Sequence, residues 1–242
     1  MMGCMSGRFA WVMMLTMVPA SLLAALHNPS NTFRSVRAAK DAPADTDPQS
    51  RFWKGAGEAL ITRDPLGGAV PLPATHVYSR WTHDSLYFLF ACPYRTLYLN
   101  PHPHPATETF ALWNWDVAEV FIGSDFEDIR RYKEFEISPQ GEWVDLDVNL
   151  HLPHHEDGWR WNSGLQVAAR IDRAQKVWYG WIKIPFGALG PLPPRDGTIF
   201  RLNLYRQQEP PPAQVQLAWQ PTGVLQFHVP ERFGRLLLVS SQ

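Results

Sequence analysis

The sequence predicts an all-β protein in which two antiparallel sheets pack as a β-sandwich, immunoglobulin-like or jelly-roll-like in type. Short runs of alternating apolar and polar residues recur along the chain, and turn-forming residues separate them. No long stretch repeats apolar residues at the spacing of a helix. The 22 prolines among 242 residues favour loops and turns over long helices. Together these observations exclude a mainly helical protein.

Ten segments carry the strand pattern, and turn signals such as Pro139-Gln140-Gly141 and Asp196-Gly197 lie between them. The expected strands cover residues 75–81, 85–92, 117–122, 132–138, 142–149, 165–171, 176–184, 199–206, 215–219 and 235–239. A short helical turn is expected at 185–189. Regularly spaced short strands of this kind are typical of a sandwich or a barrel.

Alternation within the strands assigns side chains to faces, because successive residues of a strand point to opposite sides. In 199–206 the core face is expected to hold Phe200, Leu202 and Leu204, and the opposite face Arg201, Asn203 and Tyr205. In 132–138 Phe135 and Ile137 point one way, and Tyr132, Glu134 and Glu136 point the other. In 142–149 one face holds Val144, Leu146 and Val148, and the other holds Trp143, Asp145, Asp147 and Asn149. Several strands therefore present aromatic and hydrogen-bonding groups on the face opposite the core.

The N-terminus predicts export. Residues 1–26 combine Arg8, an uncharged apolar run from Phe9 to Val18 and small residues after it, as a secretory signal peptide does. The apolar run is shorter than the roughly 20 residues of a membrane span. We expect residues 27–50 to be an extended lead-in and residues 51–242 to be one domain. The protein is then periplasmic or extracellular, with no membrane contact beyond the signal.

Charge and cysteine content exclude other classes. The formal net charge of −1 provides no electrostatic basis for binding nucleic acid or an anionic membrane. Of the two cysteines, Cys4 lies in the signal segment, so no internal disulfide is expected, and Cys92 ends an apolar run as a buried residue.

Three segments have the composition of a sugar-binding surface: 112–122, 131–141 and 200–234. Aromatic rings cover the apolar faces of a pyranose, and carboxylates, amides and guanidinium groups match its hydroxyls. These segments hold several of the 11 tryptophans next to Glu, Asp, Asn and Arg side chains. The composition favours a carbohydrate ligand.

The order of these segments resembles carbohydrate-binding module family 9, within the wider group of DOMON-like sandwiches. The resemblance runs from Trp53 to Leu238 and rests on an ordered set of residues: Trp113 or Trp115 with Asp116 and Glu119, the Tyr132-to-Glu136 strand, Ile184-Pro185-Phe186, Arg201-Leu202-Asn203 and Trp219. It implies a mono- or oligosaccharide, often a chain end, clamped between two tryptophans. The implied site comprises Trp113, Trp115, Glu119, Tyr132, Glu134, Asn203, Arg206 and Trp219. The His102-Pro103-His104-Pro105 insert departs from the family's pattern.

We expect an exported, non-catalytic carbohydrate-binding protein that serves polysaccharide breakdown and needs no cofactor. Segment 124–128 offers oxygens for Ca²⁺, but it lacks the ordered spacing of a calcium loop. One alternative is a haem-binding DOMON-like redox domain with two histidine ligands from His76, His83 and His228. Another is a small glycoside hydrolase that uses Glu119 and Glu134. A structural role also stays open for several residues: Glu119 pairing with Arg201 or Arg206, one of Trp113 and Trp115 in the core, and His151, His154 and His155 in a surface loop.

Overall fold

The structure, a computed structural model, describes residues 1, 31–191 and 194–240. Asn31–Gln242 forms a single unit. Its described strands are β1 (Thr32–Arg37), β2 (Gly57–Ile61), β3 (Thr75–Trp81), β4 (Ser85–Pro93), β5 (Val117–Gly123), β6 (Arg131–Ile137), β7 (Trp143–Asn149), β8 (Gln166–Asp172), β9 (Val177–Pro185), β10 (Ile199–Gln208), β11 (Val215–Ala218) and β12 (Gly234–Val239). Its described helices are all short 3-10 helices, namely η2 (Leu112–Asn114), η3 (His155–Arg160), η4 (Phe186–Leu189) and η5 (Pro230–Arg232).

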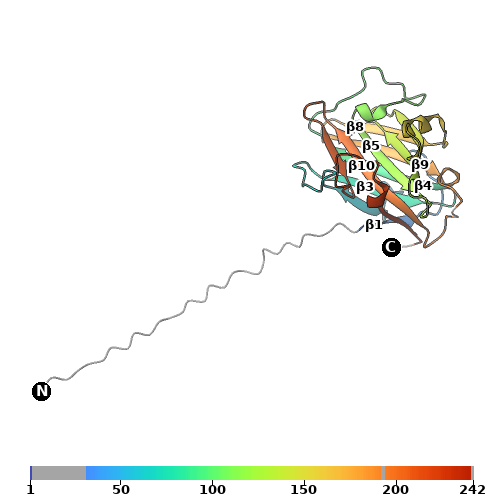
Figure 1. Cartoon of the computed structure of the whole chain (residues 1–242), viewed down its shortest axis with the longest axis horizontal. Helices are drawn as coiled ribbons and strands as arrows, with labels where there is room; N and C mark the ends of the chain where they lie inside the picture. The colour runs from blue at the N-terminus through green and yellow to red at the C-terminus, as the bar shows by residue number, and fades with distance from the viewer. Residues whose placement is uncertain (2–30, 192–193, 241–242) are drawn as a thin grey trace. The chain divides into compact units, whose positions relative to one another are not determined.

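The predicted all-β class is confirmed, and each of the ten expected strands is present to within two residues. The arrangement of the strands differs from the expected pair of separate sheets. All described strands form one hydrogen-bonded sheet in the order β7-β6-β5-β10-β12-β1-β3-β4-β9-β8, with β11 added to β10 and β2 added to β3. This large sheet curls until it is nearly closed into a barrel (Figure 1).

β1 is the reason for this difference. It pairs in parallel with β12 on one side and with β3 on the other, so it joins the two halves of the sheet. The expected lead-in of residues 27–50 therefore already belongs to the domain from Thr32 onward. The sequence of β1, Thr-Phe-Arg-Ser-Val-Arg, is short and does not alternate regularly, which is why local pattern did not reveal it. The expected signal peptide at 1–26 lies outside the described residues, Met1 excepted.

The main core fills the interior of the curled sheet. Phe88 and Phe90 of β4 and Ile182 of β9 pack there with Val120 of β5 and Leu202 of β10. The two halves approach closely at Gly180 in β9, where a Cβ atom would lie 3.0 Å from a methyl group of Ile137 in β6. Glycine at this position lets the halves close over the core.

A second, smaller apolar cluster covers the outer face of β5, β6, β7 and β10. Phe121, Tyr132 and Tyr205 belong to it, together with Leu146 and Val148 of β7. The expected separation of faces is confirmed in β6 and β10. In β7 the apolar residues Val144, Leu146 and Val148 lie on the outer face, as the pairing of Leu146 with Glu134 of β6 shows. This outer face therefore mixes apolar residues with the expected carboxylates.

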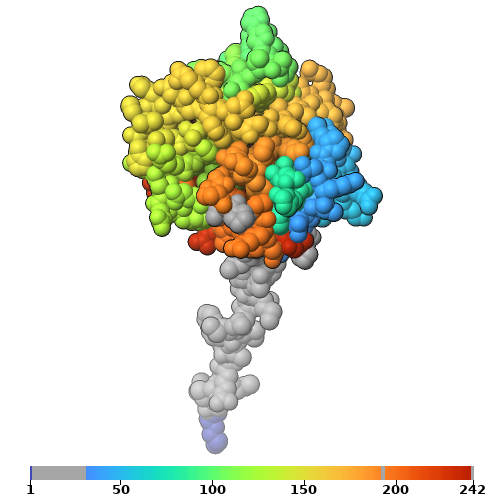
Figure 2. Space-filling model, turned by 90° about the vertical axis from the view of Figure 1, so that its right-hand side faces the viewer, coloured from blue at the N-terminus to red at the C-terminus, as the bar shows by residue number. Residues whose placement is uncertain are grey.

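Two further features concern the surface. The segment between β4 and η2, which includes the His102-to-Pro105 insert, forms the green projection at the top of the domain (Figure 2). Among the described residues, no helix has the length and apolar character that crossing a membrane requires.

Candidate ligand-binding pocket

A pocket of about 450 Å³ opens on the outer face of β5, β6, β7 and β10. Its volume lies within the roughly 300–1,000 Å³ that is usual for small-molecule sites. It is lined by Phe110, Trp113, Glu119, Phe121, Glu134, Leu146, His155, Glu156, Gln207, Gln216, Phe227 and His228. The pocket thus combines aromatic walls with a polar floor.

The walls are aromatic. η2 carries Trp113 and is anchored by the fully buried Leu112 beside it. The rings of Trp113 and Phe110 meet edge to face, with their centroids 5.3 Å apart. Phe110 is 47% exposed, so its ring remains accessible. Phe227 stacks on the ring of Tyr205 at 4.1 Å and forms another part of the lining. Flat, partly exposed rings of this kind can cover the apolar face of a ligand.

The floor holds carboxylates from two neighbouring strands. Glu119 of β5 lies directly across from Glu136 of β6, and Phe121 lies across from Glu134. The three glutamates therefore share one face of the sheet, and one carboxylate oxygen of each lies within 4.8 Å of those of the other two. Each side chain is at most 3% exposed. Two unit charges 4.8 Å apart repel by roughly 3.5 kcal/mol at an effective dielectric constant of about 20.

Burial raises the pKa values of all three carboxyl groups, and repulsion between charges adds to the effect for Glu119 and Glu136. Burial raises the pKa of Glu134 to about 7. Burial also raises the pKa of Glu119 well above its usual range, and the negative charge of Glu134 adds to the effect. The pKa of Glu136 is raised by burial first and then by the charges of Glu119 and Glu134. The floor therefore holds its full negative charge only when a cation compensates it.

Two histidines complete the pocket. Nδ1 of His228 lies 2.6 Å from the hydroxyl of Tyr132, and Nε2 of His228 lies 3.2 Å from Nε2 of His155. The same Nε2 of His228 is 3.9 Å from Oε2 of Glu134. Burial lowers the pKa of His228 to about 3, with the neighbouring His155 as the second cause. His228 is therefore a neutral imidazole at neutral pH.

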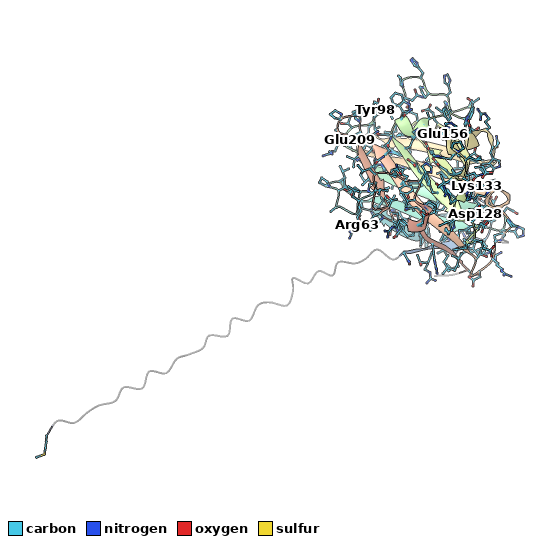
Figure 3. All side chains as sticks on the ribbon, viewed as in Figure 1. Arg63, Tyr98, Asp128, Lys133, Glu156 and Glu209 are labelled. Atoms are coloured by element: carbon cyan, nitrogen blue, oxygen red, sulfur yellow. The ribbon has the colours of Figure 1, made fainter. Side chains whose placement is uncertain are left out.

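Three of the eight expected site residues line this pocket: Trp113, Glu119 and Glu134. Tyr132 lies behind them and contacts the pocket through His228. Trp115 packs instead against Tyr98, with ring centroids 4.7 Å apart. Figure 3 labels Tyr98 and the pocket residue Glu156 in the upper part of the domain, and neither Trp115 nor Tyr98 is among the residues that line the pocket.

Asn203 lies on the expected face, but its amide already has partners within the protein. Its Nδ2 donates to the hydroxyl of Tyr205 at 2.6 Å and to the carbonyl of Gln220 at 2.9 Å. Its Oδ1 accepts hydrogen bonds from two main-chain N–H groups, those of Leu204 and Gln220. Asn203 thus fastens the chain after β11 to β10.

The structure places Trp219 in the main core, so the expected pair of tryptophan jaws is not brought together. Trp219 is 4% exposed, and its ring lies 6.1 Å from that of Phe33 in β1. It also covers Gly234, where a Cβ atom would come within 2.8 Å of the indole. The indole therefore fills the space beside β1 and β12, the part of the sheet that the sequence pattern did not predict.

Arg206 points to the interior. It lies across from Ala118 and shares the side of Leu202 and Leu204, as its position in the alternating strand requires. Its Nη1 donates to Oγ1 of Thr75 at 3.0 Å. The guanidinium lies on the inner side of the sheet and is not part of the pocket lining.

The sequence reasoning did not find several lining residues, among them Phe110, His155, Gln207 and Gln216. His155 was expected in a surface loop, and the structure folds that segment into η3 beside β7. Gln207 follows the expected end of its strand, and its amide donates to the carbonyl of Trp113. The alternation of β10 predicts that Gln207 shares the face of Asn203 and Tyr205, so this one signal was present in the sequence.

The alternatives to sugar binding find different degrees of support in the geometry. Of the three histidines considered for haem, only His228 lines the pocket, while His76 pairs with Glu58 at 2.6 Å and His83 with Asp84 at 2.7 Å. Glu119 and Glu134 have carboxylate oxygens within 4.8 Å of each other. Retaining glycosidases hold their two carboxyl groups roughly 5–5.5 Å apart, and inverting ones roughly 6.5–9.5 Å apart to admit a water molecule. The glutamate pair is too close for the inverting arrangement and lies nearer to the retaining one.

This curled sheet, with a ligand-sized pocket on its outer face, has the fold of carbohydrate-binding module family 9. The fold is shared with a family 9 module from Caldicellulosiruptor kristjanssonii that was solved in complex with cellotriose, at a TM-score of 0.60 and 11% identity over 86% of this chain and 95% of that one. A family 9 module from the same organism in complex with glucose matches at a TM-score of 0.59 and 12% identity, over 86% of this chain and 97% of that one.

A third similar structure comes from Bacteroides uniformis ATCC 8492 and is described as a "putative carbohydrate-binding protein". It matches at a TM-score of 0.68 and 14% identity, over 87% of this chain and 99% of that one. Among curated proteins, an "Extracellular protein" from Arthroderma benhamiae is 25% identical over 140 residues, which is 53% of this chain. The match spans 63% of that relative's length. No family model matches the chain.

Proposed function

We propose that this chain is an exported, non-catalytic carbohydrate-binding protein and that the pocket beside Trp113 is its sugar site. Its family 9-like fold and the composition of the pocket support the proposal. A sugar needs flat apolar rings for its C–H face and acceptors for its hydroxyls. The pocket offers both within one cavity.

The observation that carries the proposal is a carboxylate at the base of an aromatic wall that lacks an N–H or hydroxyl donor. Oε2 of Glu134 is buried and receives no such donor from the described residues, and the hydrogen-bonding neighbour of this carboxyl group is Glu136. Trp113 and Phe110 stand in the lining of the same cavity. A sugar ring packed on these aromatic rings directs its hydroxyls to Glu134 and Glu119. The side-chain amides of Gln207 and Gln216 offer further donors and acceptors from β10 and β11.

The shape of the site favours a mono- or oligosaccharide, or the end of a longer chain, over the middle of a polysaccharide. The lining comes from η2, η3 and the loop before η5 as well as from the sheet, so the cavity has walls on several sides. A protein with such a site binds the ends of glycan chains and so keeps a partner or a cell surface close to the polysaccharide. In this way it serves polysaccharide breakdown. The same role places the protein outside the cytoplasm.

Isothermal titration calorimetry of the full chain with glucose and with cellotriose tests the proposal. We expect saturable binding that Trp113→Ala weakens by about 10-fold or more, because loss of a large apolar side chain removes about 1.5–3 kcal/mol of burial. Trp115→Ala is the matched control: it removes the same side chain two residues away, outside the pocket lining, and should change affinity by less than about twofold.

Two results would contradict the proposal. The first is an absence of binding to these sugars and to every member of a glycan array. The second is an equal loss of affinity in Trp113→Ala and Trp115→Ala. A reducing-sugar assay on the same oligosaccharides tests the non-catalytic assignment, and we expect no release above the blank.

A further inference from the structure

The floor of the pocket presents a charge problem that sugar binding alone does not solve. Glu119, Glu134 and Glu136 have carboxylate oxygens within 4.8 Å of one another, and none of the three is more than 3% exposed. Buried charges in proteins are normally paired with an opposite charge or bound to a metal. Three carboxylates this close therefore require protons or a cation.

The described residues supply no Lys or Arg ion pair to this cluster. Its one ion-pair contact is with Nε2 of His228, at 3.9 Å from Glu134. Arg201, an arginine on the same face, donates instead to main-chain carbonyls, those of Asp125, Ile129 and Arg131. Among the described residues, no lysine or arginine therefore neutralises the three glutamates.

A second observation, independent of the number of acidic residues, points to a ligand. Glu136 is fully buried, and the described residues bring no N–H or hydroxyl donor to either of its carboxylate oxygens. Its hydrogen-bonding neighbour is the carboxyl group of Glu134, and the two can pair only when one of them is protonated. Its place across from Glu119 puts its carboxylate in the cluster. A buried carboxylate without such a donor is costly unless a proton or something outside the chain binds it.

His228 lies at the edge of the cluster. Its Nδ1 is 2.6 Å from the hydroxyl of Tyr132, and its Nε2 is 3.2 Å from Nε2 of His155 and 3.9 Å from Glu134. Both ring nitrogens therefore have partners within the protein. His228 closes one side of the cluster and leaves its carboxylates to bind a ligand themselves.

We propose that Glu119, Glu134 and Glu136 bind a divalent cation at the floor of the pocket. Carboxylate oxygens suit Mg²⁺, Ca²⁺ and Mn²⁺, and Mn²⁺ is the ion of this class whose binding can be followed by spectroscopy. Oxygen ligands lie roughly 2.0–2.1 Å from Mg²⁺ and roughly 2.3–2.6 Å from Ca²⁺, so opposite ligands are about 4–5 Å apart, which agrees with carboxylate oxygens within 4.8 Å of one another. The ion replaces the missing positive charge.

The proposal goes beyond sugar binding and does not depend on it. Glu119 and Glu134 line the pocket, whereas Glu136 lies behind them. An ion held between the three faces the cavity with its remaining coordination positions. Those positions are open to water or to oxygen atoms of a ligand.

Titration of the full chain with MnCl₂ after removal of metals by EDTA tests the proposal. Bound Mn²⁺ is measured by electron paramagnetic resonance of the free ion and by calorimetry. We expect one Mn²⁺ per chain and a higher midpoint of thermal unfolding with Mn²⁺ than with EDTA. Glu136→Gln should abolish both effects. Glu127→Gln, the matched control, changes an exposed carboxylate outside the pocket and the cluster and should leave both unchanged.

A second variant keeps the test valid if Glu136→Gln fails to fold. Glu119→Gln keeps the size of the side chain and removes the charge of one of the three ligands at the pocket floor. We expect this variant to weaken Mn²⁺ binding by about 10-fold or more, because affinity for such ions depends on the number of charged ligands. The proposal is overturned if the wild-type chain binds no more Mn²⁺ than Glu136→Gln or Glu119→Gln, or if EDTA and Mn²⁺ give the same unfolding midpoint. Calorimetry with glucose on the EDTA-treated chain, run separately, shows whether sugar binding stands or fails independently.

Discussion

Replacing Trp219 by alanine separates a core role for this residue from a ligand-binding one. Trp219 is 4% exposed and packs against Phe33 and over Gly234. Truncation of a buried tryptophan to alanine costs about 3–5 kcal/mol, through lost transfer free energy and the cavity left behind. We therefore expect Trp219→Ala to lose about 3–5 kcal/mol of the free energy of unfolding while the folded fraction keeps its sugar affinity.

Urea denaturation followed by far-ultraviolet circular dichroism measures this loss. Calorimetry with glucose at a temperature where the variant is folded measures binding. Trp219→Phe is the milder companion variant, because it keeps an aromatic ring in the core and should lose less stability. If Trp219→Ala is destabilised by less than about 1 kcal/mol but no longer binds sugar, the indole faces a ligand, and the placement described above is refuted.

Three further predictions follow from the same structure. Gly234→Ala should destabilise the protein by about 1–3 kcal/mol in urea denaturation, because the added Cβ would lie 2.6 Å from the carbonyl oxygen of Asn31 and 2.8 Å from Trp219; an unchanged midpoint would contradict it. Burial raises the pKa of Glu134 from 4.5 to about 7, so between these pH values the folded state binds more protons than the unfolded state. The stability that this carboxyl group contributes is therefore fully present below pH 4.5 and is lost as the pH rises to about 7. In EDTA, Glu134→Gln should therefore gain stability relative to wild type across that range, and a constant difference between pH 4.5 and 7 would refute the assignment. Burial raises the pKa of the Cys92 thiol to about 12, so iodoacetamide at pH 8 should label Cys92 in urea but not in the native protein, as peptide mass spectrometry would show.

The strand pattern of the sequence was sufficient to predict most of the secondary structure. The alternation of Phe200, Leu202 and Leu204 predicted the core face of β10, and the glutamates of β6 lie on the predicted outer face. The same rule already placed Arg206 on the core side. Resemblance to a sugar-binding family outweighed that signal, and the structure shows that the alternation was the better guide.

The site was predictable in part, for a physical reason. Glu119 and Glu134 lie in the pocket lining as residue type and strand parity predicted, because both are local properties of the chain. Trp113 lies in η2 rather than in a strand, so only its residue type and the family resemblance pointed to it. Trp219 was misplaced because an indole suits both a core and a sugar site, and only the neighbouring β1 decides between them. Local sequence does not show which strand will lie next to a given residue.

The sequence by itself determined that the chain is all-β, where its main strands lie, and that one sheet face collects carboxylates and aromatic rings. Only the tertiary structure decided that β1 joins the two halves of the sheet in parallel and that His155 and His228, 73 residues apart, face each other above the glutamates. The alternation of side chains repeats every two residues and can be read from a short segment. The meeting of two distant loops depends instead on how the whole sheet curls, because the curl sets which ends of the strands come together.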